Sequence, residues 1–119
     1  MGQPVVHWEI AGKDAKKLQG FYADLFDWKV EMLKPDPNSP MEYGMVQTGG
    51  EGGINGGITT APKDAPYVTF YIQVDDLQTY LDKAEGLGGK TVVPPMEIPG
   101  AGHMAMFADP EGNVIGLWK

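Results

Sequence analysis

The chain has 119 residues, no cysteine, and a formal net charge of −7 from 16 carboxylates and nine lysines. Its length suits one domain with a single core, and the lack of cysteine excludes disulfides, thiolate catalysis and thiolate metal ligands. The negative charge disfavours nucleic acid, the absence of arginine disfavours strongly anionic substrates, and no apolar run reaches the roughly 20 residues of a membrane span. With no secretory signal in view, we expect a cytoplasmic protein.

The first half of the chain predicts one strand, one helix and then three strands. The strands are expected at 4–11, 28–33, 42–48 and 54–60, and the helix at 15–26. Asp14 is suited to cap this helix. Its apolar residues recur at spacings of three and four, the stripe of a helix that lies on a sheet: Leu18, Phe21, Tyr22, Leu25 and Phe26. A proline-broken loop is expected at 35–40.

The second half predicts the same order of elements. The strands are expected at 67–74, 91–93, 102–108 and 114–118, and the helix at 77–87. Gly88 and Gly89 are typical of a helix C-terminus. Pro94 and Pro95 restrict the strand that begins at 91 to a sheet edge or a bulge, because proline cannot donate to the ladder.

The two halves are copies of one pattern. Segment 7–14 matches segment 69–76, and both end in an aspartate that can cap the following helix. The sequence therefore predicts an α+β fold in one domain, 1–119, with module one at about 4–60, a linker at 61–66 and module two at about 67–119. The copies differ at a candidate site position, because the first copy begins with His7 and the second with Thr69.

Three segments resemble the vicinal oxygen chelate superfamily, the group of glyoxalase I, bleomycin-resistance proteins and extradiol dioxygenases. They are FYADLFDW at 21–28, LGGK at 87–90 and FADPEGNVIGLW at 107–118, and the likeness covers nearly the whole chain. It is greatest to small glyoxalase-like proteins that end in Gly-Leu-Trp. The resemblance implies two βαβββ modules that form a cup-shaped, eight-stranded mixed sheet with the helices outside.

Metal-using members of that family take one ligand from the first strand and one from the last strand of each module, usually His or Gln, Glu, His and Glu. Carried over by position, the first ligand falls on His7 and matches. The second falls in 54–57, where Asn55 is the only polar residue, the third falls on Thr69, and the fourth falls on Gly116. Zinc and its relatives need three or four N, O or S donors, so we expect no metal cofactor.

The candidate site residues follow from strand alternation, which puts side chains two positions apart on one face. His7 and Glu9 then share the cleft wall and are the catalytic candidates, as an imidazole–carboxylate pair. The remaining expected ligand-binding residues are Tyr43, Thr69, Tyr71, Gln73 and Trp118. His103 is a weak metal candidate beside His7, and it also fits an exposed position at a strand end.

Three functions remain open from the sequence. The favoured one is a protein that binds a small, mostly uncharged organic molecule in the cup without a full metal site. The alternative is a lyase, isomerase or dioxygenase that uses His7 and Glu9, either without metal or with a weak divalent site that includes His103. The third is an interaction module, and the family resemblance implies a homodimer. His7 could also be an inherited histidine without a role.

Overall fold

The computed structural model describes residues 2–33 and 42–119, so the loop expected at 35–40 lies outside the described residues. The described residues confirm the βαβββ order twice over. The first copy contains β1 (Val5–Gly12), α1 (Ala15–Phe26), β2 (Lys29–Met32), β3 (Gly44–Gln47) and β4 (Gly56–Thr60). After a short 3-10 helix at Pro62–Asp64, the second contains β5 (Tyr67–Gln73), α2 (Leu77–Gly86), β6 (Lys90–Ile98), β7 (Gly102–Ala108) and β8 (Val114–Trp118).

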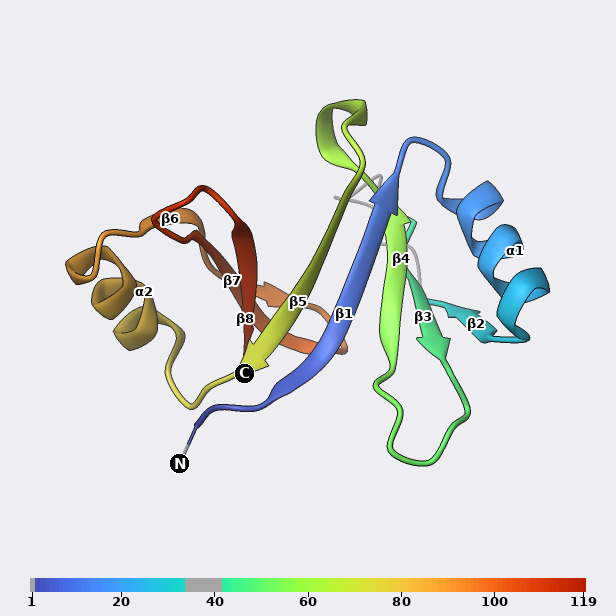
Figure 1. Cartoon of the computed structure of the whole chain (residues 1–119), viewed down its shortest axis with the longest axis horizontal. Coiled ribbons are helices and arrows are strands. Elements are labelled where there is room, and N and C mark those ends of the chain that lie inside the picture. The colour runs from blue at the N-terminus through green and yellow to red at the C-terminus, as the bar shows by residue number, and fades with distance from the viewer. Residues whose placement is uncertain (1, 34–41) are drawn as a thin grey trace. The chain divides into compact units, whose positions relative to one another are not determined.

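The chain divides into two compact units. The first unit is His7–Val68, and the second unit is Met1–Val6 together with Thr69–Lys119. The strand order is β2-β3-β4-β1 in the first and β5-β8-β7-β6 in the second, and Figure 1 shows one helix beside each set of strands. One pair in each unit is parallel, β1 with β4 and β5 with β8, and the other pairs are antiparallel. The α+β class with mixed strand directions is confirmed.

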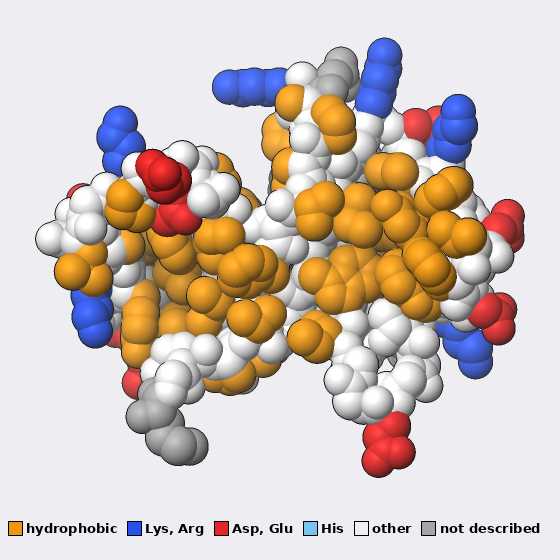
Figure 2. Space-filling model, in the orientation of Figure 1, with side chains coloured by type: hydrophobic (Ala, Val, Ile, Leu, Met, Phe, Trp, Pro, Cys, Tyr) orange, Lys and Arg blue, Asp and Glu red, His pale blue; other side chains and the backbone are white. Residues whose placement is uncertain are grey.

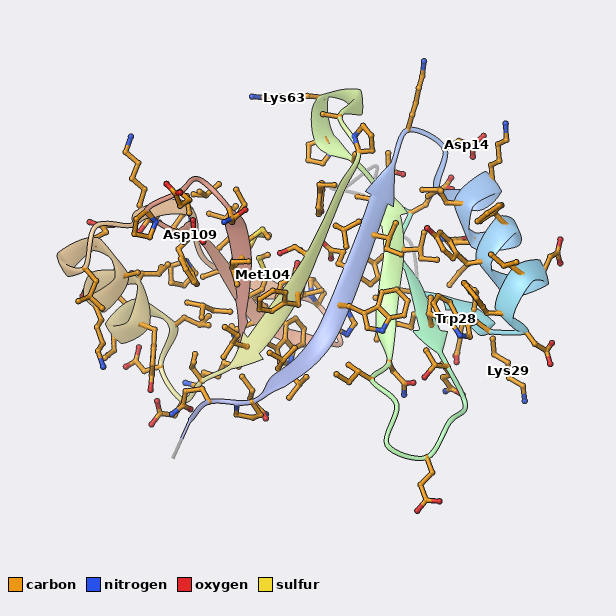
Figure 3. All side chains as sticks on the ribbon, in the orientation of Figure 1. Asp14, Trp28, Lys29, Lys63, Met104 and Asp109 are labelled. Atoms are coloured by element: carbon orange, nitrogen blue, oxygen red, sulfur yellow. The ribbon has the colours of Figure 1, made fainter. Side chains whose placement is uncertain are left out.

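Both helices begin at the predicted aspartates. The Asp14 side chain accepts a hydrogen bond from the Lys17 amide at 3.1 Å, and the Asp76 side chain accepts one from the Thr79 amide at 3.3 Å. Figure 3 labels Asp14 at the start of α1. Each bond satisfies an amide that has no partner inside the helix. Neither helix has the length or apolar character to cross a membrane in the part of the chain that the structure describes.

The prediction that the apolar stripe of α1 faces the strands is wrong in part. Ala15 and Gln19 are the buried residues, whereas Phe21 and Leu25 are each 57% exposed and Phe26 is 53% exposed. Gln19 fits against the strands because its side-chain amide donates to the Ile58 carbonyl at 3.0 Å. A polar residue therefore occupies the sheet side of the helix, and large apolar residues lie outside it.

A cluster of aromatic rings joins α1 to the strands of the first unit. The Trp28 ring centroid lies 5.1 Å from that of Trp8, 5.7 Å from that of Tyr22 and 5.1 Å from that of Phe26, and Figure 3 labels Trp28 beside the end of the helix. A Cβ atom at Gly56 would overlap the Trp8 ring. Glycine at this position therefore lets Trp8 lie flat on β4, on the helix side of the strands.

The second unit has an aliphatic core, and its edge strand, β6, is longer than the sequence predicted. Its core consists of Val74, Leu77, Leu81, Ala105 and Leu117. The strand predicted at 91–93 runs through both prolines as β6, with register shifts at Thr91/Val93 and Val93/Met96. It lies at the end of the unit's strand order, as predicted for a proline-containing strand.

Candidate functional site

The candidate site lies on the face of β1 that points away from α1. In the β1–β4 register, Trp8 is opposite Gly56 and Glu9 is opposite Gly57. Since Trp8 packs with the rings of α1, alternation places Glu9 on the other face, as predicted. Glu9 is only 4% exposed. Burying a carboxylate lowers the stability of the folded state unless hydrogen-bond donors of the protein replace the water molecules that solvate it.

Two tyrosine hydroxyls supply those donors. The Tyr43 hydroxyl donates to Glu9 Oε1 at 2.9 Å, and the Tyr67 hydroxyl donates to Glu9 Oε2 at 2.6 Å. His7 Nε2 lies 2.8 Å from the same Tyr43 oxygen. His7, Glu9 and Tyr43, which the sequence placed in one site, are thus brought together in the first unit, and Tyr67 joins them. Below, these four residues are called the tyrosine–carboxylate network.

The direction of the hydrogen bonds fixes the His7 tautomer. Tyr43 has a single hydroxyl proton and gives it to Glu9, so its oxygen accepts a proton from His7 Nε2–H. Burial lowers the pKa of His7 below its ordinary value of 6.5, and the Glu9 charge opposes this shift only in part. His7 is therefore neutral at pH 7, with its proton on Nε2 and directed toward Tyr43.

Tyr67 is the site residue that the sequence analysis missed. Burial, followed by the charge of Glu9 and the hydrogen bond to it, raises the pKa of Tyr67 far above 10. Tyr67 therefore stays protonated and continues to donate at any physiological pH. The signal was present in the sequence, because Tyr67 alternates with Thr69, Tyr71 and Gln73 along the predicted strand.

In each module a glycine of the last strand lies against a tyrosine ring, although the two tyrosines come from different places in the module. Gly57 on β4 lies opposite Glu9, and Gly116 on β8 lies opposite Tyr71. A Cβ atom at Gly57 would overlap the ring and hydroxyl of Tyr43, and one at Gly116 would overlap the Tyr71 ring. The resemblance assigns one carboxylate metal ligand to Gly116 and another to the segment 54–57, which includes Gly57. Here glycine makes room for a tyrosine instead.

The residues present do not fit a divalent metal ion. His7 Nε2 carries the proton donated to Tyr43, so only Nδ1 of this ring could supply a lone pair to a metal ion. Both oxygens of Glu9 accept hydroxyls, and a metal would compete with these donors. Among the described residues, no three His, Asp or Glu side chains form a group that could hold a metal ion. Zinc sites need three or more such donors.

The other predicted site residues lie in the second unit. The Thr69 hydroxyl donates to the Val114 carbonyl at 2.7 Å, so it serves the β5–β8 pair. Tyr71 is buried and meets Trp118 edge to face at 6.3 Å, whereas Gln73 is exposed. A role for these residues in ligand binding stays a prediction.

His103 also lies in the second unit, on β7. Its side chain is 53% exposed, and its Nε2 is 4.0 Å from the Glu97 carboxylate. An exposed pair at this distance is a weak interaction. The geometry therefore matches the exposed strand-end position that the sequence analysis considered for His103.

Comparison with known proteins establishes the family. The model of the Glyoxalase/Bleomycin resistance protein/Dioxygenase superfamily matches residues 5–117. The chain belongs to this superfamily, and the resemblance seen in the sequence is confirmed.

Two curated relatives extend well beyond the matched region. CFP32, a proposed glyoxylase of Mycobacterium tuberculosis, is 31% identical over 121 residues, which cover 98% of this chain and 46% of the relative. The anthracycline biosynthesis protein DnrV of Streptomyces peucetius is 25% identical over 128 residues, which cover 94% of this chain and 45% of the relative. The chain thus spans about half the length of either relative.

A solved structure shares the fold. The methylmalonyl-CoA epimerase of Mycobacterium tuberculosis superposes with a TM-score of 0.72 at 15% identity, over 96% of this chain and 85% of the epimerase. This likeness shows the fold alone.

The lowered pKa of the half-buried His7 predicts that the stability of the fold depends on pH in the acid range. Between the lowered pKa of native His7 and 6.5, the unfolded chain binds more protons than the native chain, so stability rises with pH through this window and is lost as pH falls. Urea unfolding at a series of pH values should show this rise, and His7→Gln should flatten it. An NMR titration that places the His7 pKa above 6.5, or an unchanged slope in His7→Gln, would contradict the assignment.

Proposed function

We propose that the protein binds a small, mostly uncharged organic molecule at the tyrosine–carboxylate network, without a divalent metal. The observation that supports this most is the Glu9 carboxylate, which is buried and bound by two tyrosine hydroxyls. In a family whose metal-using members place carboxylates around a metal ion, phenols surround Glu9, the one carboxylate that is buried among the described residues.

The chemistry of the network favours a neutral ligand. Tyrosine and histidine offer both donors and acceptors beside flat apolar rings, a combination suited to carbonyl, hydroxyl and aromatic groups. An anionic group would meet the charge of Glu9, in a chain with a net charge of −7 and no arginine to clamp it. The relative named for anthracycline biosynthesis is consistent with a small organic ligand.

A fragment panel tests this proposal. Neutral ketones, lactones and phenols, each with a carboxylate counterpart, are titrated while the NMR signals of His7 and Tyr43 are followed. We expect the neutral fragments to shift these signals and their carboxylates to bind less tightly. Tyr67→Phe removes one donor to Glu9 and should weaken binding by about fivefold, the value of one hydrogen bond near 1 kcal/mol.

Tyr80→Phe is the matched control, because Tyr80 packs against the core of the second unit. It should leave fragment binding unchanged. If no neutral fragment shifts the His7 and Tyr43 signals, or if both phenylalanine variants weaken binding equally, the proposal fails.

A second candidate function is metal-independent proton transfer, supported by the continuous chain of hydrogen bonds from His7 through Tyr43 to Glu9. A neutral His7 that removes a proton from a carbon acid can pass its Nε2 proton to Tyr43, while Tyr43 passes its own proton to Glu9. The carbon acid becomes an enolate and Glu9 becomes a carboxylic acid, so the protons and charges balance. A relay of this kind lets a buried carboxylate act as base without touching the substrate.

Deuterium exchange separates the two candidates. A neutral ketone from the fragment panel, with a hydrogen on the carbon next to its carbonyl, serves as the probe in D₂O with a chelator present. If the relay operates, wild-type protein incorporates deuterium next to the carbonyl, and Tyr43→Phe lowers the rate by about a hundredfold or more. Tyr80→Phe should leave the rate unchanged. A wild-type rate no faster than buffer, or full exchange in Tyr43→Phe, would rule out this relay on this substrate.

A further inference from the structure

A second hollow of the first unit lies on the face of β1 opposite to the tyrosine–carboxylate network. It is an open groove of about 750 Å³, and its described lining residues all belong to segments 10–22 and 66–68 of that unit. Figure 2 shows hydrophobic side chains gathered over β1 and α1, with lysine side chains at the edge where α1 begins. A groove of this volume suits a small organic molecule.

The place where α1 is anchored leaves this groove open. The buried Gln19 side chain bonds to the Ile58 carbonyl of β4, and α1 lies closest to β4 and β2. Ile10 of β1, which alternation places on the helix side of the strands, is therefore only partly covered. A Cβ atom at Gly12 would overlap the Leu18 side chain, so glycine lets Leu18 lie against the end of β1.

Apolar side chains on two segments flank the groove. On α1, Phe21 and Tyr22 pack edge to face with their centroids 5.1 Å apart, and Phe21 is 57% exposed. At the start of β5, the Tyr67 side chain reaches Glu9 on the other face, so alternation directs Val68 to the groove side. Val68 is 75% exposed. Exposed apolar residues gathered around one groove, unlike scattered ones, mark a binding site.

The mouth of the groove is positively charged in an acidic chain. Residues 13–17 contain three lysines and one aspartate, a local net charge of +2 in a chain whose net charge is −7. Lys13 and Lys17 line the groove, and in the described part of the chain neither lies within ion-pair distance of a carboxylate. The Asp14 carboxylate is occupied as the helix cap. Two ammonium groups beside an apolar groove complement an anionic group on an apolar molecule.

We infer that this groove binds a small carboxylate with a flat apolar body, separately from the tyrosine–carboxylate network. The apolar body lies between Phe21 and Val68, and the carboxylate lies at Lys13 and Lys17. Lysine acts as a point charge, so a single carboxylate does not need the guanidinium fork that the chain lacks. The two faces of β1 then have opposite preferences, since the charge of Glu9 disfavours anions and the groove selects them.

NMR titration with 2-naphthoate tests this inference. Its uncharged counterpart of the same shape, 2-naphthamide, is the matched ligand. We expect 2-naphthoate to shift the methyl signals of Ile10, Leu18 and Val68 saturably, with nuclear Overhauser effects from the naphthalene protons to these methyl groups. At about 0.15 M salt, where distant charges are screened, it should bind about tenfold more tightly than the amide.

Removal of single charges locates the carboxylate. Lys13→Gln and Lys17→Gln should each weaken 2-naphthoate binding by about threefold and leave amide binding unchanged. Lys16→Gln is the control, because it removes the same charge from the same turn, but Lys16 lies on another side of α1, beside Gln19. It should leave the binding of both ligands unchanged.

Removal of apolar surface locates the ring. Phe21→Ala and Val68→Ser should each weaken the binding of both ligands by about fivefold. Both side chains are more than half exposed, and the melting temperature of each variant shows whether it is folded. A loss confined to 2-naphthoate in these two variants would contradict the placement of the ring.

Three results would overturn the inference as a whole. They are equal affinities for 2-naphthoate and its amide, equal losses in Lys16→Gln and Lys17→Gln, and the lack of a saturable shift at the three methyl signals. Methyl shifts that follow protein concentration without ligand would show that a protein surface covers the groove, and would also overturn it. The methyl signals report on the groove and the His7 and Tyr43 signals on the network, so this inference and the proposed function fail separately.

Discussion

The burial of the Glu9 carboxylate is the constraint on which the candidate site depends. Removing a carboxylate from water costs roughly several kcal/mol, and the structure offsets this with a hydroxyl donor on each oxygen. The donors come from different parts of the first unit, Tyr43 just before β3 and Tyr67 at the start of β5. Burial and the charge of Glu9 together keep Tyr67 protonated, and the carboxylate orients the His7 ring through Tyr43.

Close packing of tyrosine rings on two last-strand glycines shapes the face of the strands in each unit. At Gly57 and at Gly116 a tyrosine ring lies directly against the backbone, so a side chain at either position would overlap the ring. Restoring a ligand at either glycine would therefore displace a tyrosine, and in the first unit it would also remove a donor from Glu9. A glycine packed against a tyrosine ring is found in the last strand of both modules, so this packing is a property of the whole repeat.

Much of the fold could be predicted from the sequence because local signals and the repeat agree. Capping aspartates, strand alternation and paired glycines fixed both helices and most strands. The errors arose where tertiary contacts override local pattern. The spacing of apolar residues in α1 predicted that Phe21 faces the strands. In the structure Gln19 faces them, because its side chain donates to the Ile58 carbonyl, and Phe21 is exposed. The structure brings His7, Glu9 and Tyr43 together. Strand alternation could place Tyr67 on the same face as Thr69, but local sequence could not show its hydrogen bond to Glu9, 58 positions away.

The central claim is that phenol hydroxyls, and not a metal ion, hold the buried carboxylate. Calorimetric titration of chelator-treated protein with Zn²⁺ tests this most directly. We predict no saturable uptake that depends on His7, so that wild-type protein and His7→Ala give the same curve. Binding of one zinc ion per chain by the wild type, lost in His7→Ala, would show that the network opens to a metal and would contradict the claim.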